Sequence, residues 1–161
     1  MNDTNIKTID TVKEADALIE ILSTGAVFPL VVTGSSMLPF LKEGRDTVRL
    51  RKPDKLRRGQ IVFFRNRAGG FTLHRIRKIY RDGSLLINGD AQAWCEPVHP
   101  KQVLAEVISV SRGDRVIDPN SAKQRLLSSL WYPTRIFRPF IWKLFSFWRK
   151  TFKKHTPGGT P

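Results

Sequence analysis

Apolar residues near the start of the chain recur at the spacing of one helix face. These positions are Val12, Ala15, Leu18, Ile19 and Leu22. Thr11 and Glu14 have the spacing of a capping box, and Gly25 supplies a stop signal after the last apolar position. The pattern therefore predicts a short amphipathic helix within residues 1–25.

From residue 26 to residue 118 the pattern changes to short runs of β-branched and aromatic residues separated by turn sequences such as NRAGG and RDG. The runs occupy residues 26–32, 46–50, 60–65, 71–80, 84–88 and 103–111. This alternation predicts a mostly β fold, a compact antiparallel domain. Within residues 71–80, strand periodicity places His74 and Ile76 on one face and Arg75 and Arg77 on the other.

The chain has no acidic residue after Asp118, and residues 119–154 combine Lys and Arg with many aromatic residues. On a helical wheel, residues 136–154 separate into an aromatic half and a cationic half. This predicts an amphipathic helix at a membrane interface, whose contacts are Trp131, Phe137, Phe140, Trp148, Arg149 and Lys150. The alternative is that the aromatic half packs on the β domain. Residues 155–161 are predicted to be a disordered end.

The formal net charge is +14, from 28 Lys and Arg against 14 Asp and Glu, so an anionic partner is expected. Nucleic acid would need rings and charges on the same side, whereas here they are segregated, which favours anionic lipid. No apolar run approaches the ~20 residues of a spanning helix, and no cleavable signal is visible. We therefore expect peripheral or monotopic membrane association, with the cytoplasmic face slightly favoured.

A candidate nucleophile lies in residues 33–44, TGSSMLPFLKEG. Gly34 permits a tight turn before Ser35 and Ser36, Met37 is a candidate apolar anchor, and Pro39 stiffens the exit. Alone, such a stretch is more often a simple turn. A serine becomes a nucleophile when a base can take its proton, and His74 is the candidate base.

The ordered set of Gly-x-Ser-Met-x-Pro, His-Arg-Ile and Gly-Asp in residues 26–112 resembles the signal peptidase I superfamily, which includes the self-cleaving SOS and phage repressors. The resemblance implies that Ser36 is the nucleophile and His74 the base, as in the archaeal and endoplasmic-reticulum enzymes. It also implies that Asp90 orients the histidine, and that the fold is a compact domain of coiled antiparallel sheet.

The chemistry of these residues is coherent. A histidine with a pKa of about 6.5 is largely neutral at pH 7 and can accept a serine proton, while a nearby acid stabilises the imidazolium. Both Asp90 and Glu96 are candidate partners of His74, and Asp90 is favoured. Gly34 stands where many bacterial signal peptidases have a serine, so the oxyanion would depend on the backbone N–H of Ser36, assisted by the Ser35 hydroxyl.

The sequence therefore predicts a membrane-associated serine endopeptidase that cleaves a precursor or leader peptide. Neither a metal nor an organic cofactor is expected, because the single cysteine, Cys95, lacks a CxxC partner and the serine chemistry needs neither. Two alternatives stay open: a non-catalytic member of the fold that binds peptide or membrane, and an autoproteolytic regulator.

Overall fold

The computed structural model describes residues 12–137 of the chain. The elements, in chain order, are α1 (Val12–Ser23), β1 (Phe28–Val31), β2 (Asp46–Arg51), β3 (Ile61–Arg65), β4 (Phe71–Ile79), β5 (Leu85–Asn88), β6 (Glu96–Val98), the 3-10 helix η1 (Pro100–Gln102), β7 (Val103–Arg112), β8 (Arg115–Ile117), α2 (Ala122–Trp131) and the 3-10 helix η2 (Tyr132–Phe137). The predicted helix in residues 1–25 and all six predicted strand regions are present.

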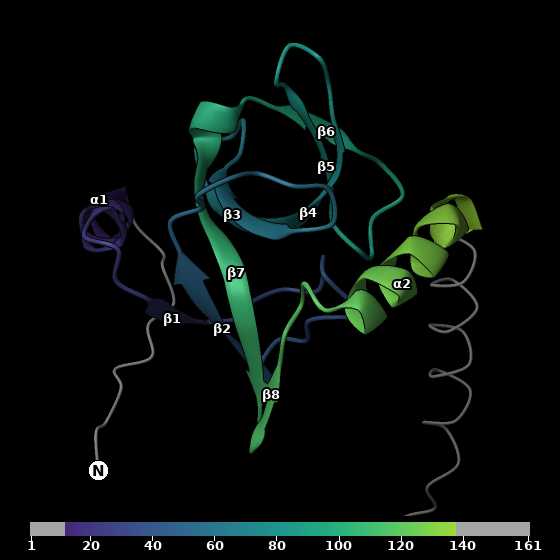
Figure 1. Ribbon diagram of the computed structural model, residues 1–161, viewed down its shortest axis with the longest axis horizontal. Helices are drawn as coiled ribbons and strands as arrows, with labels where there is room; N and C mark the ends of the chain where they lie inside the picture. The colour runs from purple at the N-terminus through teal and green to yellow at the C-terminus, as the bar shows by residue number, and fades with distance from the viewer. Residues whose placement is uncertain (1–11, 138–161) are drawn as a thin grey trace, which may run out of the picture.

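The strands form one 8-stranded sheet in the order β1-β2-β7-β3-β4-β5-β6, with β8 paired to β7. Every pairing is antiparallel. Strand β7 is central, since its first half pairs with β3 and its second half with β2 and β8 (Figure 1). The prediction of a mostly β, antiparallel domain with a helix toward each end is confirmed.

Two apolar clusters lie on opposite faces of the sheet, as alternation along β3 shows. Ile61 and Phe63 belong to one cluster, and Val62 and Phe64 to the other. The first cluster also contains two residues of the 33–44 loop, Met37 and Leu41. Complete burial of such side chains stabilises by about 1.5–3 kcal/mol each, so the core itself fixes the loop that carries Ser36.

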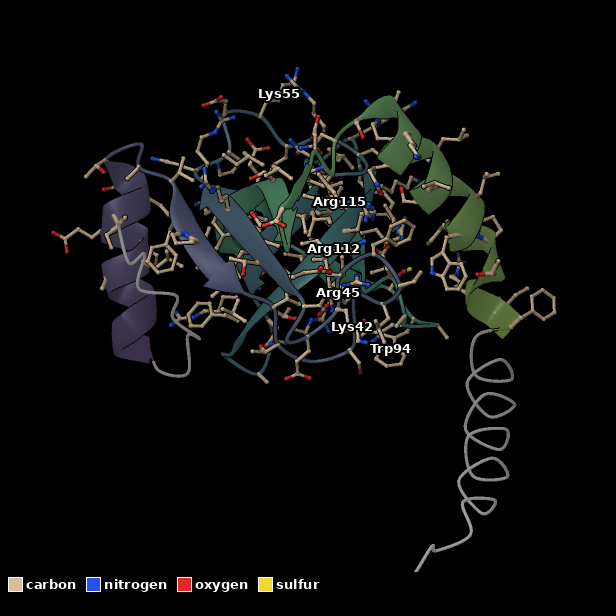
Figure 2. All side chains as sticks on the ribbon, turned by 90° about the horizontal axis from the view of Figure 1, so that it is seen from below. Lys42, Arg45, Lys55, Trp94, Arg112 and Arg115 are labelled. Carbon is tan, nitrogen blue, oxygen red and sulfur yellow. The ribbon has the colours of Figure 1, made fainter. Side chains whose placement is uncertain are left out.

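The helices lie at opposite ends of the molecule, α1 beside β1 and α2 beyond the far side of the sheet (Figures 1 and 2). Helix α1 buries Leu18 and Leu22, whereas Ile19, predicted for the buried face, is 41% exposed. The hydroxyl of Ser121 caps α2 by accepting from the Gln124 backbone N–H.

Within residues 12–137, no helix combines the length and apolar character needed to cross a membrane. Four of the predicted membrane contacts, Phe140, Trp148, Arg149 and Lys150, lie outside the described residues.

Candidate active site

The loop of residues 33–44 is a series of tight turns that starts at Gly34. Gly34 has φ +75°, a conformation that residues with a Cβ rarely adopt, which explains why glycine stands at this position. The Leu38 N–H donates to the Ser35 carbonyl at 3.2 Å, and the Leu41 N–H donates to the Met37 carbonyl at 2.9 Å. Met37 is buried, as an apolar anchor should be, while Ser35 and Pro39 are exposed and Ser36 is half-buried.

The far end of this loop is held by Asp46, which is buried at the start of β2. Its carboxylate accepts from the Lys42 backbone N–H at 2.8 Å and from the guanidinium groups of Arg45 and Arg112. Arg112 also donates to the Phe40 carbonyl at 3.0 Å. Burial would raise the Asp46 pKa, but the hydrogen bonds from the two arginines and Lys42 outweigh it and lower the pKa to about 2.

The near end of the loop contacts the connection between β5 and β6. The Ala91 N–H donates to the Ser36 carbonyl at 2.8 Å. A Cβ added to Gly89 would lie 2.8 Å from the same carbonyl oxygen and 2.7 Å from Oε1 of Gln92. Only glycine fits this approach without a shift, so the Gly-Asp motif brings the 89–95 connection against the serine backbone.

His74 lies on β4, is 4% exposed, and pairs with a carboxylate through one ring nitrogen. Its Nδ1 is 3.0 Å from Oε1 of Glu96, the first residue of β6. A carboxylate only accepts hydrogen bonds, so Nδ1 carries the proton and Nε2 presents its lone pair. Burial lowers the His74 pKa below its usual value, and the attraction of Glu96 offsets only part of that effect. The imidazole is therefore held neutral and able to accept a proton at pH 7.

The Nε2 atom of His74 is buried and has no hydrogen-bond partner among the described residues, so the Ser36–His74 hydrogen bond is not formed in this structure. The segment that follows β5 links the two residues. Asn88 pairs with Arg75, the neighbour of His74 on β4. The next residue, Gly89, closely approaches the Ser36 carbonyl.

Asp90 is the predicted partner of His74, but the carboxylate that bonds the histidine is that of Glu96, and Asp90 acts on His74 only through its charge, which raises the His74 pKa. The fully buried carboxylate of Asp90 accepts from Nη2 of Arg75 at 2.8 Å and from Arg77. The reason is strand alternation, since both arginines leave β4 on the face opposite His74. Asp90 therefore positions the 89–95 connection, and Glu96, the open alternative, is the carboxylate on the histidine. The sequence signal for this difference is the alternation of His74 with Arg75 and Arg77 along β4. It indicates that an acid bonded to the arginines lies on the opposite face from the histidine.

Trp131 also has a different place from the one predicted. It is half-buried, and its indole N–H donates to the Asp90 carbonyl at 2.6 Å, so this end of the ring faces the β domain rather than lipid. The next residue, Tyr132, has its hydroxyl 3.5 Å from Sγ of Cys95. The junction of α2 and η2 thus fastens the C-terminal helix to the connection that supports Ser36, a role that the aromatic composition alone did not reveal.

Within residues 12–137, no group of three His, Cys, Asp or Glu side chains is placed to hold a metal ion. A scan against protein-family profiles and a search of curated proteins found no match for this chain. The chemical interpretation therefore depends on the geometry of the side chains and on the ordered motifs.

A narrow recess of about 70 Å³ lies beside Ser36, between the end of β1 and the start of β4. It is lined by residues 30–33, 36–37, 63 and 71–73. Strand β1 is at the edge of the sheet, and β5 pairs with β4 only from Arg75 onward. The end of β1 and the start of β4 therefore border the recess. Each of these strand ends has one edge that is not paired with any described strand.

Proposed function

We propose that this protein is a membrane-associated serine endopeptidase, similar to signal peptidase I, that cleaves a precursor or leader peptide. The observation that carries the proposal is the state of His74: it is buried and bonded to Glu96 through Nδ1, and its Nε2 has no hydrogen-bond partner among residues 12–137. A buried ring nitrogen without a partner costs about 1–3 kcal/mol, and functional sites are where such costs are usually found.

In the proposed reaction, Nε2 of His74 accepts the hydroxyl proton of Ser36 as Oγ attacks the scissile carbonyl carbon. Glu96 stabilises the imidazolium that forms. When the tetrahedral intermediate collapses, the C–N bond breaks and His74 returns the proton to the leaving amine, which leaves an ester on Ser36. A water molecule, deprotonated by the same nitrogen, hydrolyses that ester and restores the serine.

The substrate would bind as an extended strand beside β4. Residues 71–73 and the end of β1 offer unpaired backbone groups on either side of the narrow recess, the arrangement that strand addition needs. The small volume of the recess supports a small side chain just before the scissile bond. The oxyanion would be held by backbone N–H groups of the loop, because Gly34 has no hydroxyl to offer.

The test is cleavage of precursor peptides by the purified full chain and by two variants, Ser36→Ala and His74→Ala. Matched controls are Ser129→Ala and His99→Ala, which remove the same groups from exposed positions outside the site. We expect both site variants to lose at least ~100-fold in kcat/KM and both controls to keep the wild-type value. Equal product from the wild type and the site variants would eliminate the proposed site.

The same experiment separates the two alternatives. A non-catalytic peptide-binding member would bind the peptides without yielding product. An autoproteolytic regulator would yield a shortened form of the chain itself on ageing, and the Ser36→Ala protein would not.

Membrane association is supported by the orientation of α2. Its one buried residue is Ser128, whereas Leu126 is 61% and Leu130 66% exposed. Ile136 and Phe137 in η2 are similarly exposed, immediately before the basic aromatic sequence. Leu130 also borders a recess of about 490 Å³ against the β domain. The exposed apolar side chains of Leu126, Ile136 and Phe137 fit the interface of an anionic bilayer.

We expect the full chain to float with vesicles of anionic lipid and less with zwitterionic vesicles. Replacing Leu126 and Leu130 by serine should lower flotation several-fold, because two apolar side chains would no longer enter the acyl boundary. Val116→Ser, which removes an equally exposed apolar residue from β8, is the control. Unchanged flotation in the double variant would remove α2 from the contact.

A further inference from the structure

Ser36 borders a second recess that differs in both size and chemistry from the narrow one. The second recess has a volume of about 340 Å³, against about 70 Å³ for the first. It is lined by Ser35, Ser36, Leu38, Ala91, Gln92 and Trp94. The candidate nucleophile therefore stands between a narrow recess at the ends of β1 and β4 and a wide, mostly apolar recess against the 89–95 connection.

The wall of the wide recess ends in Trp94, whose side chain is 63% exposed and projects at the border of the molecule (Figure 2). The backbone below this ring is fixed, because the Trp94 carbonyl accepts from the side-chain amide of Asn88, a buried residue of β5. The next two residues are also held, Cys95 by the Tyr132 hydroxyl and Glu96 by His74. The ring is thus presented to solvent by a rigid support and not by a loose loop.

A single exposed apolar side chain needs no explanation on its own. Here, however, a large amphipathic ring lines the same recess as the candidate nucleophile, and tryptophan supplies more contact area at low conformational cost than most residues. The position of Trp94 therefore predicts that its ring contacts a ligand. Because Ser36 lines the same recess, we expect that ligand to be the peptide on which Ser36 acts.

The direction of the substrate follows from the narrow recess. If the residues before the scissile bond pair with the strand ends of β1 and β4, the chain beyond the bond must leave on the opposite side of Ser36. We infer that Leu38, Ala91 and Trp94 form the subsite for the first residues after the scissile bond and select a bulky apolar or aromatic side chain there. This inference rests on the proposed function and adds a specificity for the substrate residues on the amine side of the scissile bond.

The test uses peptides that are identical except for Ser, Ala, Leu or Phe immediately after the scissile bond, cleaved in competition and counted by mass spectrometry. For the wild-type full chain we expect kcat/KM to be ~10-fold higher with Leu or Phe than with Ser, the size of discrimination that an apolar pocket gives. Trp94→Ala should bring this ratio close to one, and Trp94→Phe should restore most of it. Val116→Ala, on β8, should keep the wild-type ratio.

A second measurement keeps the inference testable whether or not the chain cleaves peptides. Binding of the labelled Leu and Ser peptides to Ser36→Ala protein is followed by fluorescence anisotropy, with and without Trp94→Ala. We expect the Leu peptide to bind ~10-fold tighter only when Trp94 is present. Cleavage with equal rates for all four peptides would overturn the subsite and leave the peptidase standing. Selective binding without any cleavage would overturn the peptidase and leave the subsite.

Discussion

Replacing Glu96 by glutamine tests the pairing that the structure assigns to His74. The lost interaction is a charge-assisted hydrogen bond of 3.0 Å on a buried imidazole, worth about 1.5–3 kcal/mol. At 1.36 kcal/mol per tenfold change in rate, the expected loss in kcat/KM is about 10- to 150-fold. The upper part of the range is expected, because the glutamine amide can donate to Nδ1 and so favour the tautomer whose Nε2 carries the proton and cannot accept another.

The pH dependence of kcat/KM in the Glu96→Gln variant tests the same pairing independently, through the direction in which the acid limb moves. The Glu96 carboxylate raises the His74 pKa against the larger lowering by burial, so its removal should lower that pKa further. Only neutral His74 can act as the base, so the acid limb of kcat/KM should move to lower pH while the plateau falls. The assay is hydrolysis of a fluorogenic peptide between pH 4.5 and 9.

Glu106→Gln is the matched control, since it removes a buried carboxylate that bonds Gln60 and Arg51 away from the site. For Glu106→Gln, the plateau and the acid limb of the kcat/KM pH profile should equal those of the wild type once activity is corrected for the folded fraction. A Glu96→Gln plateau within threefold of the wild type, with an unmoved acid limb, would refute the assignment.

Three further predictions concern the supports of the site. Asp90→Asn should lower the free energy of unfolding by about 3–5 kcal/mol in urea denaturation, because two buried guanidinium groups lose their counter-charge; a loss below 1 kcal/mol would contradict the structural role. The Asp46 pKa is about 2 in the folded chain, whereas an ordinary aspartate has a pKa of 3.8. The ionised carboxylate therefore contributes about 2 kcal/mol to the free energy of unfolding above pH 4, and this contribution should be lost as the pH falls from 4 to 2. Urea midpoints over that range should fall less steeply for Asp46→Asn. Gly89→Ala should cut kcat/KM at least ~10-fold, since its Cβ would press on the Ser36 carbonyl, whereas Gly70→Ala, whose nearest contact is an ordinary 3.5 Å, should not.

The strand pattern of the sheet was predictable because its strands are long enough to show alternation or a continuous buried run. The four consecutive apolar residues of β3 are all buried because clusters lie on both faces. The sequence did not predict β6 and β8, which have three residues each, and β6 contains a proline. Such short strands exist through pairing with β5 and β7 and have no periodicity of their own.

The roles of the two acids depended on register, which local sequence does not fix. Along the chain both Asp90 and Glu96 are candidate partners of His74, and the Gly-Asp motif favours Asp90. The pairing of Ile87 with Glu96 carries the second acid to the histidine, while strand alternation turns Arg75 and Arg77 toward the first. The loop geometry at Gly34 was foreseen from the residue type, but the contact of Gly89 with the serine carbonyl was not.

The C-terminal segment shows a different limit of sequence reasoning. A helical wheel over residues 136–154 emphasised aromatic residues, but α2 begins at Ala122 and already exposes leucines. Conversely, Trp131 is of a residue type common at membrane interfaces, yet its indole N–H donates to the Asp90 carbonyl. In both cases the packing of α2 on the β domain determines which side chains are exposed, and the sequence pattern does not show this packing.

The most direct test of the central claim is the distance from Oγ of Ser36 to Nε2 of His74 in a crystal structure with a bound peptide whose scissile amide is reduced. We predict that the two atoms lie within about 2.6–3.2 Å of each other, with Nδ1 still on Glu96. Clear density for the peptide across the loop, with the serine hydroxyl and the imidazole turned to different surroundings and out of hydrogen-bonding reach, would contradict the proposed mechanism.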